Sequence, residues 1–324
     1  MKLLIAGGTG FLGYHALREA LRRGHTVTAL GRPPLPAAEL FPHSVRLIEA
    51  DLGTLSDHEL IGVTAGYDGV VFAAGADDRA LPRAPAYDYF YDANVRQCTR
   101  FLQAARQGGA HRAVVLNSYF AYFDRVWPHM RLAERHPYIR SRVEQAQAAV
   151  VEGLAVMILE LPYIFGVMPE GFDYVPIWKP LVDYVRSPWP LFYTRGGTAM
   201  IAVQHVAEAI VGALERGEPG RRYPIGDENR TWEAWLTLIG ELAGRRKRFV
   251  AVPPALVRVG MVGLRLWWRA RGLESGLEPV AFVDLQTRHT YYDPAPSREA
   301  LGYGQGGLDA ALAVTVRACI RAAT

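Results

Sequence analysis

Lysine is almost missing from this chain of 324 residues. Lys2, Lys179 and Lys247 are the only lysines among 36 basic residues, which leaves 33 arginines. With 32 acidic residues the formal net charge is +4, and so small a balance over this length does not predict a nucleic acid as the main partner. Any kind of site that normally uses a lysine must therefore be inspected for an arginine.

Cysteines and long apolar runs are also scarce. Cys98 and Cys319 are too few for a disulfide framework or a metal cage, which fits a reducing compartment, and we expect a cytoplasmic protein without a metal site. The opening apolar run stops at glycines after about five residues, too short for a signal peptide. No stretch reaches the ~18 apolar residues of a membrane-spanning helix. Hydrophobic residues make up 50% of the chain, enough for one large or two modest domains with a buried core.

Short apolar runs alternate with helix-spaced apolar patterns through the first half of the chain. The runs predict strands at Leu3–Ala6, Thr26–Leu30, Val45–Ala50, Gly69–Ala73, Ala113–Asn117 and Ala155–Leu161. The helical patterns cover Phe11–Arg23, Asp88–Gln107 and Tyr138–Glu152. Strands separated by helices indicate an α/β fold of the Rossmann type, with a doubly wound parallel sheet.

The amino-acid composition changes after Pro162, where prolines become frequent and nine aromatic residues lie between positions 163 and 193. We therefore expect a dinucleotide-binding domain over 1–165, to which 198–226 returns. The segments 166–197 and 227–324 are expected to form a smaller, loop-rich substrate-binding lobe.

Three glycines, Gly7, Gly10 and Gly13, stand between the first predicted strand and the first predicted helix. Glycine there permits a tight turn, close approach of a pyrophosphate and packing of the helix on the sheet, while the helix N-terminus attracts the phosphates. A dinucleotide site is predicted, with a purely structural turn as the alternative. Thr9, Phe11 and Leu12 of the same turn are further candidate contacts.

The end of the second predicted strand reads Leu30-Gly31-Arg32 and offers no carboxylate for the ribose 2′-hydroxyl of NAD. Because an arginine can neutralise the 2′-phosphate of NADP, we expect NADP(H) to be favoured over NAD(H). Arg32 as a solvated loop residue is the alternative. Asp51 and Leu52, after the third strand, are expected to touch the adenine, although Asp51 could equally cap the next helix.

Several ordered motifs support a family assignment. Gly7–Gly13 looks like a phosphate turn, Val70–Gly75 looks like a fourth-strand motif with Phe72 where a histidine is common, and Asn94–Arg106 and Tyr223–Gly226 match later motifs. Together they resemble the extended short-chain dehydrogenase/reductase family, also called the NAD-dependent epimerase/dehydratase family. The resemblance implies further cofactor contacts at Ala73, Ala74, Gly75, Asn94, Pro162 and Ile164, and makes a homodimer plausible.

The same resemblance places the catalytic residues. Leu116-Asn117-Ser118 is similar to the family's serine element, which puts Ser118 where a serine orients the substrate oxygen. Pro137–Glu144 looks like the active-site helix, with Tyr138 as acid/base. The family expects a lysine four residues later, to favour the phenolate and hold the nicotinamide ribose. This chain has Arg142.

The chemistry explains why these residue types are needed. A tyrosine, with an ordinary pKa of about 10, needs a nearby cation to lose its proton near neutrality, and a spacing of four places both groups on one helical face. Arg142 keeps the charge and the donors, but stays protonated and cannot relay a proton. Three interpretations remain open: arginine substitutes functionally, the enzyme is slowed or altered, or the chain is a dinucleotide-binding module. A general lysine-to-arginine replacement could also explain Arg142.

The substrate region argues against a typical nucleotide-sugar enzyme. Tyr119 and Phe120 follow Ser118, where similar sugar-nucleotide dehydratases carry acidic residues, and Ile164 replaces an asparagine that holds the sugar nucleotide. The candidate substrate contacts are Tyr163, Phe165, Phe172 and Tyr174. They favour an apolar or aromatic small molecule, although aromatic residues also build ordinary cores.

The segment Ala255–Arg271 combines leucines and tryptophans with four arginines. Such a helix could lie on a membrane or cover the mouth of the pocket, but we favour a packing helix with arginines that reach to solvent. The leading hypothesis is an NADP(H)-preferring oxidoreductase that transfers hydride between the cofactor and a carbonyl or secondary alcohol. The alternatives are a sugar or nucleotide-sugar epimerase with bound NAD(P), and a non-catalytic dinucleotide sensor.

Overall fold

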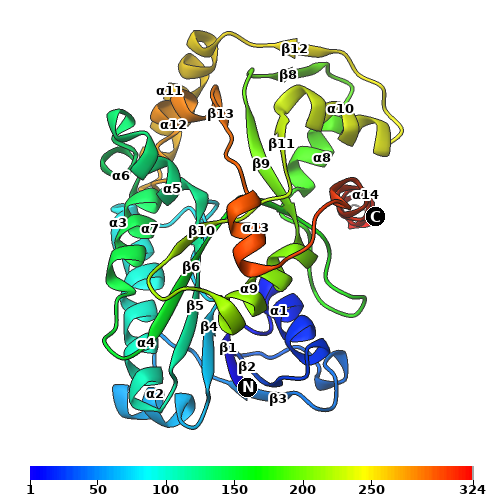
Figure 1. Ribbon diagram of the computed structural model, residues 1–324. Helices are drawn as coiled ribbons and strands as arrows, with labels where there is room; N and C mark the ends of the chain where they lie inside the picture. The colour runs from blue at the N-terminus through cyan, green and yellow to red at the C-terminus, as the bar shows by residue number, and fades with distance from the viewer. Residues whose placement is uncertain (323–324) are drawn as a thin grey trace.

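The computed structural model describes residues 1–322. Its centre is a seven-stranded sheet in the order β10-β6-β5-β4-β1-β2-β3, in which every pair is parallel. The strands are β1 (Lys2–Ala6), β2 (Thr26–Gly31), β3 (Arg46–Glu49), β4 (Gly69–Phe72), β5 (Arg112–Ser118), β6 (Ala155–Leu161) and β10 (Arg222–Pro224). The predicted doubly wound Rossmann-type sheet is confirmed (Figure 1).

Helices cover both faces of this sheet (Figure 1). One face carries α1 (Phe11–Arg22) and α9 (Val203–Arg216), and the other carries α2 (Asp57–Thr64), α4 (Gln97–Gln107) and α7 (Pro137–Ala148). Successive side chains of a strand point to opposite faces, so Leu3 and Ile5 of β1 join one apolar core while Leu4 and Ala6 join the other. A strand that contributes to both cores must be apolar on both faces, as β1 is from Leu3 to Ala6.

The region predicted as one helix over 88–107 is divided into three pieces. It contains α3 (Ala86–Phe90), a π-helical segment η2 (Tyr91–Arg96) and α4. Apolar spacing does not distinguish a π-turn from an α-turn, because the extra residue depends on tertiary partners.

A second, four-stranded sheet lies beyond the carboxyl ends of the first. It contains β9 (Gly197–Ala202), which pairs with β7 (Tyr163–Phe165), β11 (Glu228–Thr231) and β13 (His289–Thr290). Within 198–226, β9 therefore belongs to this second sheet, whereas α9 packs against α1 and β10 forms an edge of the first sheet.

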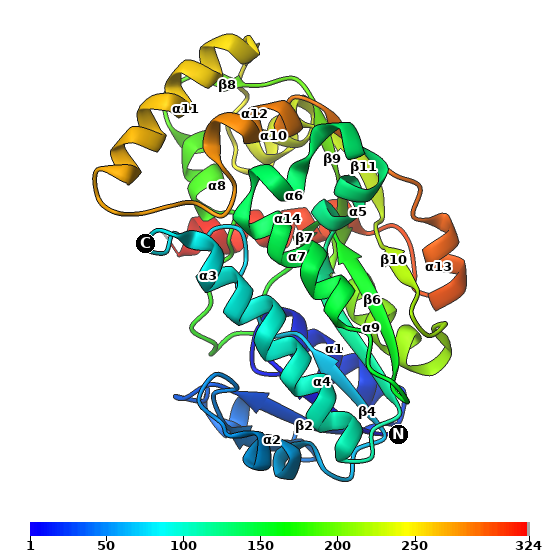
Figure 2. The same cartoon turned by 90° about the vertical axis from the view of Figure 1, so that its left-hand side faces the viewer.

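Most of the remaining elements lie on the side of the second sheet (Figure 2), except for a 3₁₀ turn near α1 and a helix that packs on α9. The remaining elements are α5 (Tyr119–Val126), α6 (Leu132–Arg135), α8 (Lys179–Arg186), β8 (Leu191–Tyr193), α10 (Trp232–Leu242), β12 (Phe249–Ala251), α11 (Pro254–Arg269), α12 (Pro279–Gln286), α13 (Ala295–Leu301), α14 (Leu308–Arg321) and the 3₁₀ turns η1 (Ala38–Leu40) and η3 (Pro128–Met130). Trp232 and Trp235 of α10 form an aromatic core here with Phe165.

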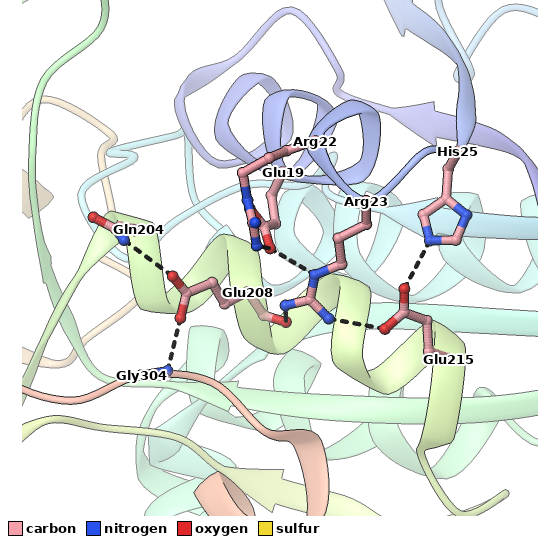
Figure 3. A network of polar contacts seen from close by, with 8 residues as sticks. All are labelled: Glu19, Arg22, Arg23, His25, Gln204, Glu208, Glu215 and Gly304. Carbon is pink, nitrogen blue, oxygen red and sulfur yellow. Dashed lines mark hydrogen bonds and ion pairs between the residues drawn. The ribbon is translucent and has the colours of Figure 1, made fainter.

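A polar network joins α1 to α9 (Figure 3). Arg23 donates to Glu19 at 2.6 Å and to Glu215 of α9 at 2.8 Å, and His25 lies 2.9 Å from the same Glu215 carboxylate. Glu208 accepts a hydrogen bond from the Gly304 amide at 2.7 Å. The network therefore joins the helix of the glycine turn to a helix nearly 200 residues later in the chain.

Candidate active site

A cavity of about 490 Å³ lies between the carboxyl ends of the central strands and the second lobe. Ligands of open parallel sheets bind at this edge, because the loops that follow the strands converge there. Most predicted site residues line the cavity: Gly7, Gly10, Phe11, Leu12, Gly13, Ala73, Ala74, Gly75, Ser118, Tyr138, Arg142, Pro162, Tyr163, Ile164 and Tyr174. The chain thus brings the glycine turn and the predicted catalytic residues to one space.

The glycine turn has no room for side chains. A Cβ at Gly13 would lie 2.1 Å from the Gly7 carbonyl oxygen, and one at Gly7, where φ is +81°, would lie 2.7 Å from the Ala73 oxygen. Gly10 precedes α1, and no side chain caps that helix. The first amides of a twelve-residue helix are therefore directed at the cavity edge without a protein acceptor, which suits a phosphate group.

Ser118 is the last residue of β5 and the N-cap of α5. Its hydroxyl accepts a hydrogen bond from the Phe120 amide at 3.3 Å, which satisfies one free donor at the start of that helix. Its own amide donates to the Asn117 side chain at 2.6 Å, and Asn117 donates to the Arg142 carbonyl at 2.9 Å. Ser118 is therefore fixed to the helix that carries Tyr138.

Tyr138 and Arg142 lie one turn apart on α7, with the guanidinium carbon 5.1 Å from the centre of the tyrosine ring. Burial raises the pKa of Tyr138 above its ordinary value of 10.0. The Arg142 charge opposes this, the Asp78 carboxylate adds to it, and contacts with Arg142 and Ser118 lower it again. Because the net direction is upward, the phenol keeps its proton at neutral pH.

The donors of Arg142 are largely occupied by protein acceptors. One terminal nitrogen donates to the Gln145 side chain at 3.0 Å and lies 3.4 Å from the Leu116 carbonyl oxygen, and the other donates to the Ala76 carbonyl at 2.9 Å. Its Nε is buried without a hydrogen-bond partner. The guanidinium therefore links β5, α7 and the loop after β4, and leaves one donor unsatisfied.

Two carboxylates enter the cavity from the loop after β4. Asp77 is paired with Arg79, which holds its pKa down against the effect of burial. Burial and the neighbouring Asp77 raise the pKa of Asp78 to about 6. A group that titrates close to neutrality thus lies in the electrostatic range of Tyr138. Sequence reasoning missed these three residues, although their place directly after a parallel strand is a signal for a site.

The rest of the wall is largely aromatic and aliphatic. Tyr119 and Phe120 of α5, Tyr163 of β7 and Trp178 line the cavity, together with Tyr174, which stacks on Phe11 with ring centres 5.1 Å apart. Burial raises the pKa of Tyr119, whose hydroxyl lies 3.0 Å from that of Thr198. Ile177 and Trp178 were not predicted as site residues.

Several predicted cofactor contacts lie outside the cavity. Thr9 lies against Gly31, at which a Cβ would be 2.3 Å from the threonine hydroxyl. Arg32 is exposed and makes no ion pair or hydrogen bond among residues 1–322. Asp51 accepts a hydrogen bond from the Gly53 amide, while Ser56 caps α2. Leu52 is buried in the sheet core.

The side chains of three other predicted residues are engaged in contacts inside the protein. Asn94 is fully buried and joins the Ala76 amide to the Ser141 hydroxyl. Phe165 is 1% exposed and stacks on Trp178, and Phe172 packs against Tyr14 and Phe41. Their side chains do not line the cavity. Aromatic content alone cannot separate wall residues from core residues.

Comparison with known proteins places this site among nicotinamide-dependent enzymes. The family model described as NAD(P)H-binding matches residues 7–169. A 4-hydroxy-2-methyl-3-oxo-4-farnesyl-3,4-dihydroquinoline-1-oxide ketoreductase of Stigmatella aurantiaca is 27% identical, with 96% of this chain and 95% of that protein covered. A UDP-glucose 4-epimerase of Corynebacterium glutamicum is 30% identical, with coverage of 68% and 73%. The crystal structure of gox2253 has a TM-score of 0.79 at 20% identity, covering 99% of this chain and 98% of that one.

Proposed function

This chain belongs to the NAD(P)H-binding proteins of the extended short-chain dehydrogenase/reductase family, and we propose that it is an NADP(H)-dependent reductase of a ketone on a mostly apolar small molecule. Relatives named as reductases and epimerases support an NAD(P)-dependent enzyme. One observation carries the finer proposal. Ser118, Tyr138 and Arg142 share a cavity with the glycine turn, and the rest of its wall consists mainly of aromatic and aliphatic residues.

The residues present fit a nicotinamide dinucleotide. Gly7 and Gly13 leave a cradle that any Cβ would fill, and the uncapped amides of α1 open onto it. Arg142, whose buried Nε has no hydrogen-bond partner among residues 1–322, also lines the cavity. The turn would hold the pyrophosphate, and Arg142 would face the nicotinamide ribose.

Arg32 supports the preference for NADP(H). It follows β2 directly, is exposed and has no competing acceptor among residues 1–322. A free guanidinium can form charge-assisted hydrogen bonds with a 2′-phosphate, whereas a 2′-hydroxyl needs the acceptor that Leu30-Gly31-Arg32 lacks.

The residues of the site suit proton donation to a carbonyl oxygen. Ser118 and the Tyr138 hydroxyl would hold this oxygen, and the raised pKa of Tyr138 keeps a proton ready for transfer to it. The bound cofactor supplies the hydride to the carbonyl carbon. After proton transfer, the positive charge of Arg142 would stabilise the tyrosinate until solvent returns the proton.

The composition of the cavity wall favours an apolar substrate over a nucleoside diphosphate. The aromatic residues of α5 and β7 are accompanied by Asp77 and Asp78, and the charge of Arg79 is engaged by Asp77. Carboxylates repel phosphates, while a largely apolar cavity gains free energy by burying rings or alkyl groups.

Oxidation of NADPH and NADH should be followed by absorbance with a panel of aryl and alkyl ketones. We expect turnover with NADPH, loss of nearly all turnover in Tyr138→Phe, and unchanged NADPH binding by that variant. Arg32→Ala should weaken NADPH at least about tenfold and NADH little. NADPH binding without turnover by the wild type would indicate a non-catalytic binding protein, and equal turnover by wild type and Tyr138→Phe would show that Tyr138 is not the acid. Tighter binding of NADH would remove the NADP(H) preference.

The similarity to UDP-glucose 4-epimerase supports a second candidate, an epimerase with transiently reduced cofactor. It predicts that NAD(P) co-purifies with the protein and that turnover of a UDP-sugar causes no net change in cofactor absorbance. Incubation of the purified protein with UDP-glucose, with product sugars separated by chromatography, distinguishes this candidate from the reductase.

A further inference from the structure

Helix α11 has no buried residue, although its sequence is mainly apolar. Leu256, Val259, Leu266 and Trp267 are between 51% and 71% exposed. Their spacing places all four on one side of the helix. The half-buried residues Val257, Met261, Leu264 and Trp268 share another side, and α11 packs on α12. The favoured packing role therefore accounts for one side of this helix and leaves an apolar side open.

The same region concentrates positive charge. Between Glu241 and Glu274 the chain has eight basic residues and no acidic residue, so the rest of the chain is net negative. Arg258 pairs with Asp284 and Arg265 with Glu278. The other arginines are exposed and form no ion pair within residues 1–322; they are Arg245, Arg246, Arg248, Arg269 and Arg271.

Neighbouring segments extend this surface. Strand β12 follows the basic residues 245–248 and pairs with β8, at the same end of the molecule as α11 (Figures 1 and 2). Trp189, just before β8, is 67% exposed, and Lys247 donates to its carbonyl at 2.8 Å. Arg271 lies over the ring of Trp267 at 3.9 Å. Exposed tryptophans are thus surrounded by unpaired cations.

We propose that this α11 surface, consisting of α11, residues 245–248, Trp189 and Arg271, binds the surface of an anionic lipid bilayer. An amphipathic basic helix with tryptophan on its apolar side lies in the headgroup region, where its arginines contact lipid phosphates. No helix of residues 1–322 is long and apolar enough to cross a membrane, so the contact is peripheral.

A second copy of this chain is a poorer occupant. In a two-fold symmetric contact the same surface meets itself, which would bring together two sets of six basic residues that have no ion pair within residues 1–322. An anionic bilayer supplies both the apolar layer and the countercharge.

The surface is connected to the cavity. Gly272 and Glu274, just after α11, pair through their backbones with the segment before α3, and the Gly276 carbonyl accepts a hydrogen bond from the Tyr138 amide at 2.9 Å. The lipid-binding helix is therefore followed within seven residues by a contact with the predicted catalytic helix. Lipid binding itself does not depend on the proposed reaction.

Flotation with vesicles tests the proposal. The purified full chain is mixed with vesicles of phosphatidylcholine alone or of phosphatidylcholine and phosphatidylglycerol in equal amounts. We expect it to float mainly with the anionic vesicles, and less at high salt. Val259→Glu should weaken partitioning at least about tenfold, as should Arg269→Glu/Arg271→Glu.

Matched controls carry the same charge changes elsewhere. Val150→Glu replaces a valine that is 82% exposed, and Arg46→Glu/Arg317→Glu reverses two exposed arginines. Both should float like the wild type, and thermal unfolding should be equal in all variants. Absence of wild-type flotation, or equal loss in the controls, would overturn the proposal. So would a dimer in sedimentation velocity that Val259→Glu dissociates without any vesicle binding.

Discussion

At the scale of single residues, the charge around Tyr138 determines what the cavity can do. One fixed cation, Arg142, and one carboxylate with a pKa of about 6, Asp78, act on the same phenol in opposite directions. Because burial raises the pKa of Tyr138 as well, the resting state is the protonated acid. A protonated Tyr138 is the state that the proposed reduction requires near neutral pH.

Asp78→Asn removes the carboxylate that raises the pKa of Tyr138, so this pKa should fall. Since the proposed acid must be protonated, the decrease of kcat/KM at alkaline pH should begin at a lower pH in the variant, and the ionisation near pH 6 should disappear. Asp77→Asn is the control, because Asp77 is paired with Arg79 and should leave the alkaline limb in place. Coincident alkaline limbs in Asp78→Asn and wild type would contradict the assignment.

Arg142→Lys restores the family pattern but should lower kcat by about tenfold rather than raise it. The guanidinium reaches Ala76, Gln145 and Leu116, and a single ammonium cannot bind acceptors on all three segments. Arg142→Met should lower kcat further and move the alkaline limb to higher pH, because it removes the charge that lowers the pKa of Tyr138. A faster Arg142→Lys enzyme would mean that arginine detunes the site.

The resemblance to the family's motifs was sufficient to predict that Ser118, Tyr138 and Arg142 belong to one site. It could not show that the arginine's donors are bound by Ala76 and Gln145, since those contacts depend on how α7 packs on the loop after β4.

At the scale of elements, the π-helical segment η2 supports the site through the buried side chain of Asn94. It presents Asn94 to the interior, where Oδ1 accepts from the Ala76 amide at 2.9 Å and Nδ2 donates to the Ser141 hydroxyl at 3.1 Å. Ser141 in turn donates to the Tyr138 carbonyl at 2.7 Å. Asn94, which was predicted to contact the cofactor, thus holds the loop after β4, and the Ala76 carbonyl of that loop accepts a hydrogen bond from Arg142.

Asn94→Leu should lower the free energy of unfolding by about 3 kcal/mol, because it leaves a buried amide at Ala76 without an acceptor. Tyr138 should also lose part of its positioning, so kcat should fall more than the affinity for NADPH. Urea unfolding and steady-state kinetics measure the two effects. Gln97→Leu is the control, because Gln97 begins the next helix, α4, and its side chain binds only the half-buried Asp92 among residues 1–322. An equal loss of stability there would contradict a special role for Asn94.

The prediction of one uninterrupted helix over 88–107 was wrong, because the periodicity of apolar residues does not reveal a π-helical segment. The apolar residues of η2 and α4 follow a helical pattern, yet the π-turn depends on partners at Ala76 and Ser141. Sequence spacing contains no information on such distant partners.

At the scale of the whole molecule, the chain crosses several times between the two sheets. Strand β7 leaves the end of β6 to pair with β9, and α9 then returns to pack on α1. Strand β10 was not predicted, since Arg222–Pro224 is not an apolar run and pairs with β6, which lies far earlier in the chain. The other six strands of the parallel sheet were predictable because each is a local apolar run. The pairing of β7 with β9 was not, since the two strands are separated by more than 30 residues without a connecting pattern.

The network in Figure 3 holds α9 against α1, and the lowered pKa values of its carboxyls predict how stability depends on pH. Hydrogen bonds from Arg22 and Arg23 lower the pKa of Glu19 against the effect of burial, and His25 and Arg23 do the same for Glu215. A carboxyl with a lowered pKa in the folded state stabilises the fold above its ordinary pKa of 4.5, and this contribution is lost as the pH falls.

Arg23→Gln should therefore lower the free energy of unfolding at pH 7 by about 2 kcal/mol, because it leaves Glu19 and Glu215 without their shared partner. The difference from the wild type should shrink as the pH falls below the ordinary carboxyl pKa, where both glutamates become protonated in either protein. Arg22→Gln is the matched control: Arg22 pairs only with Glu19 of its own helix, its side chain is 68% exposed, and its loss should change stability little. Urea unfolding across this pH range measures both variants. A difference for Arg23→Gln that stays constant with pH, or one that Arg22→Gln reproduces, would show that the ion pair of Arg23 with Glu215 does not stabilise the contact between α1 and α9.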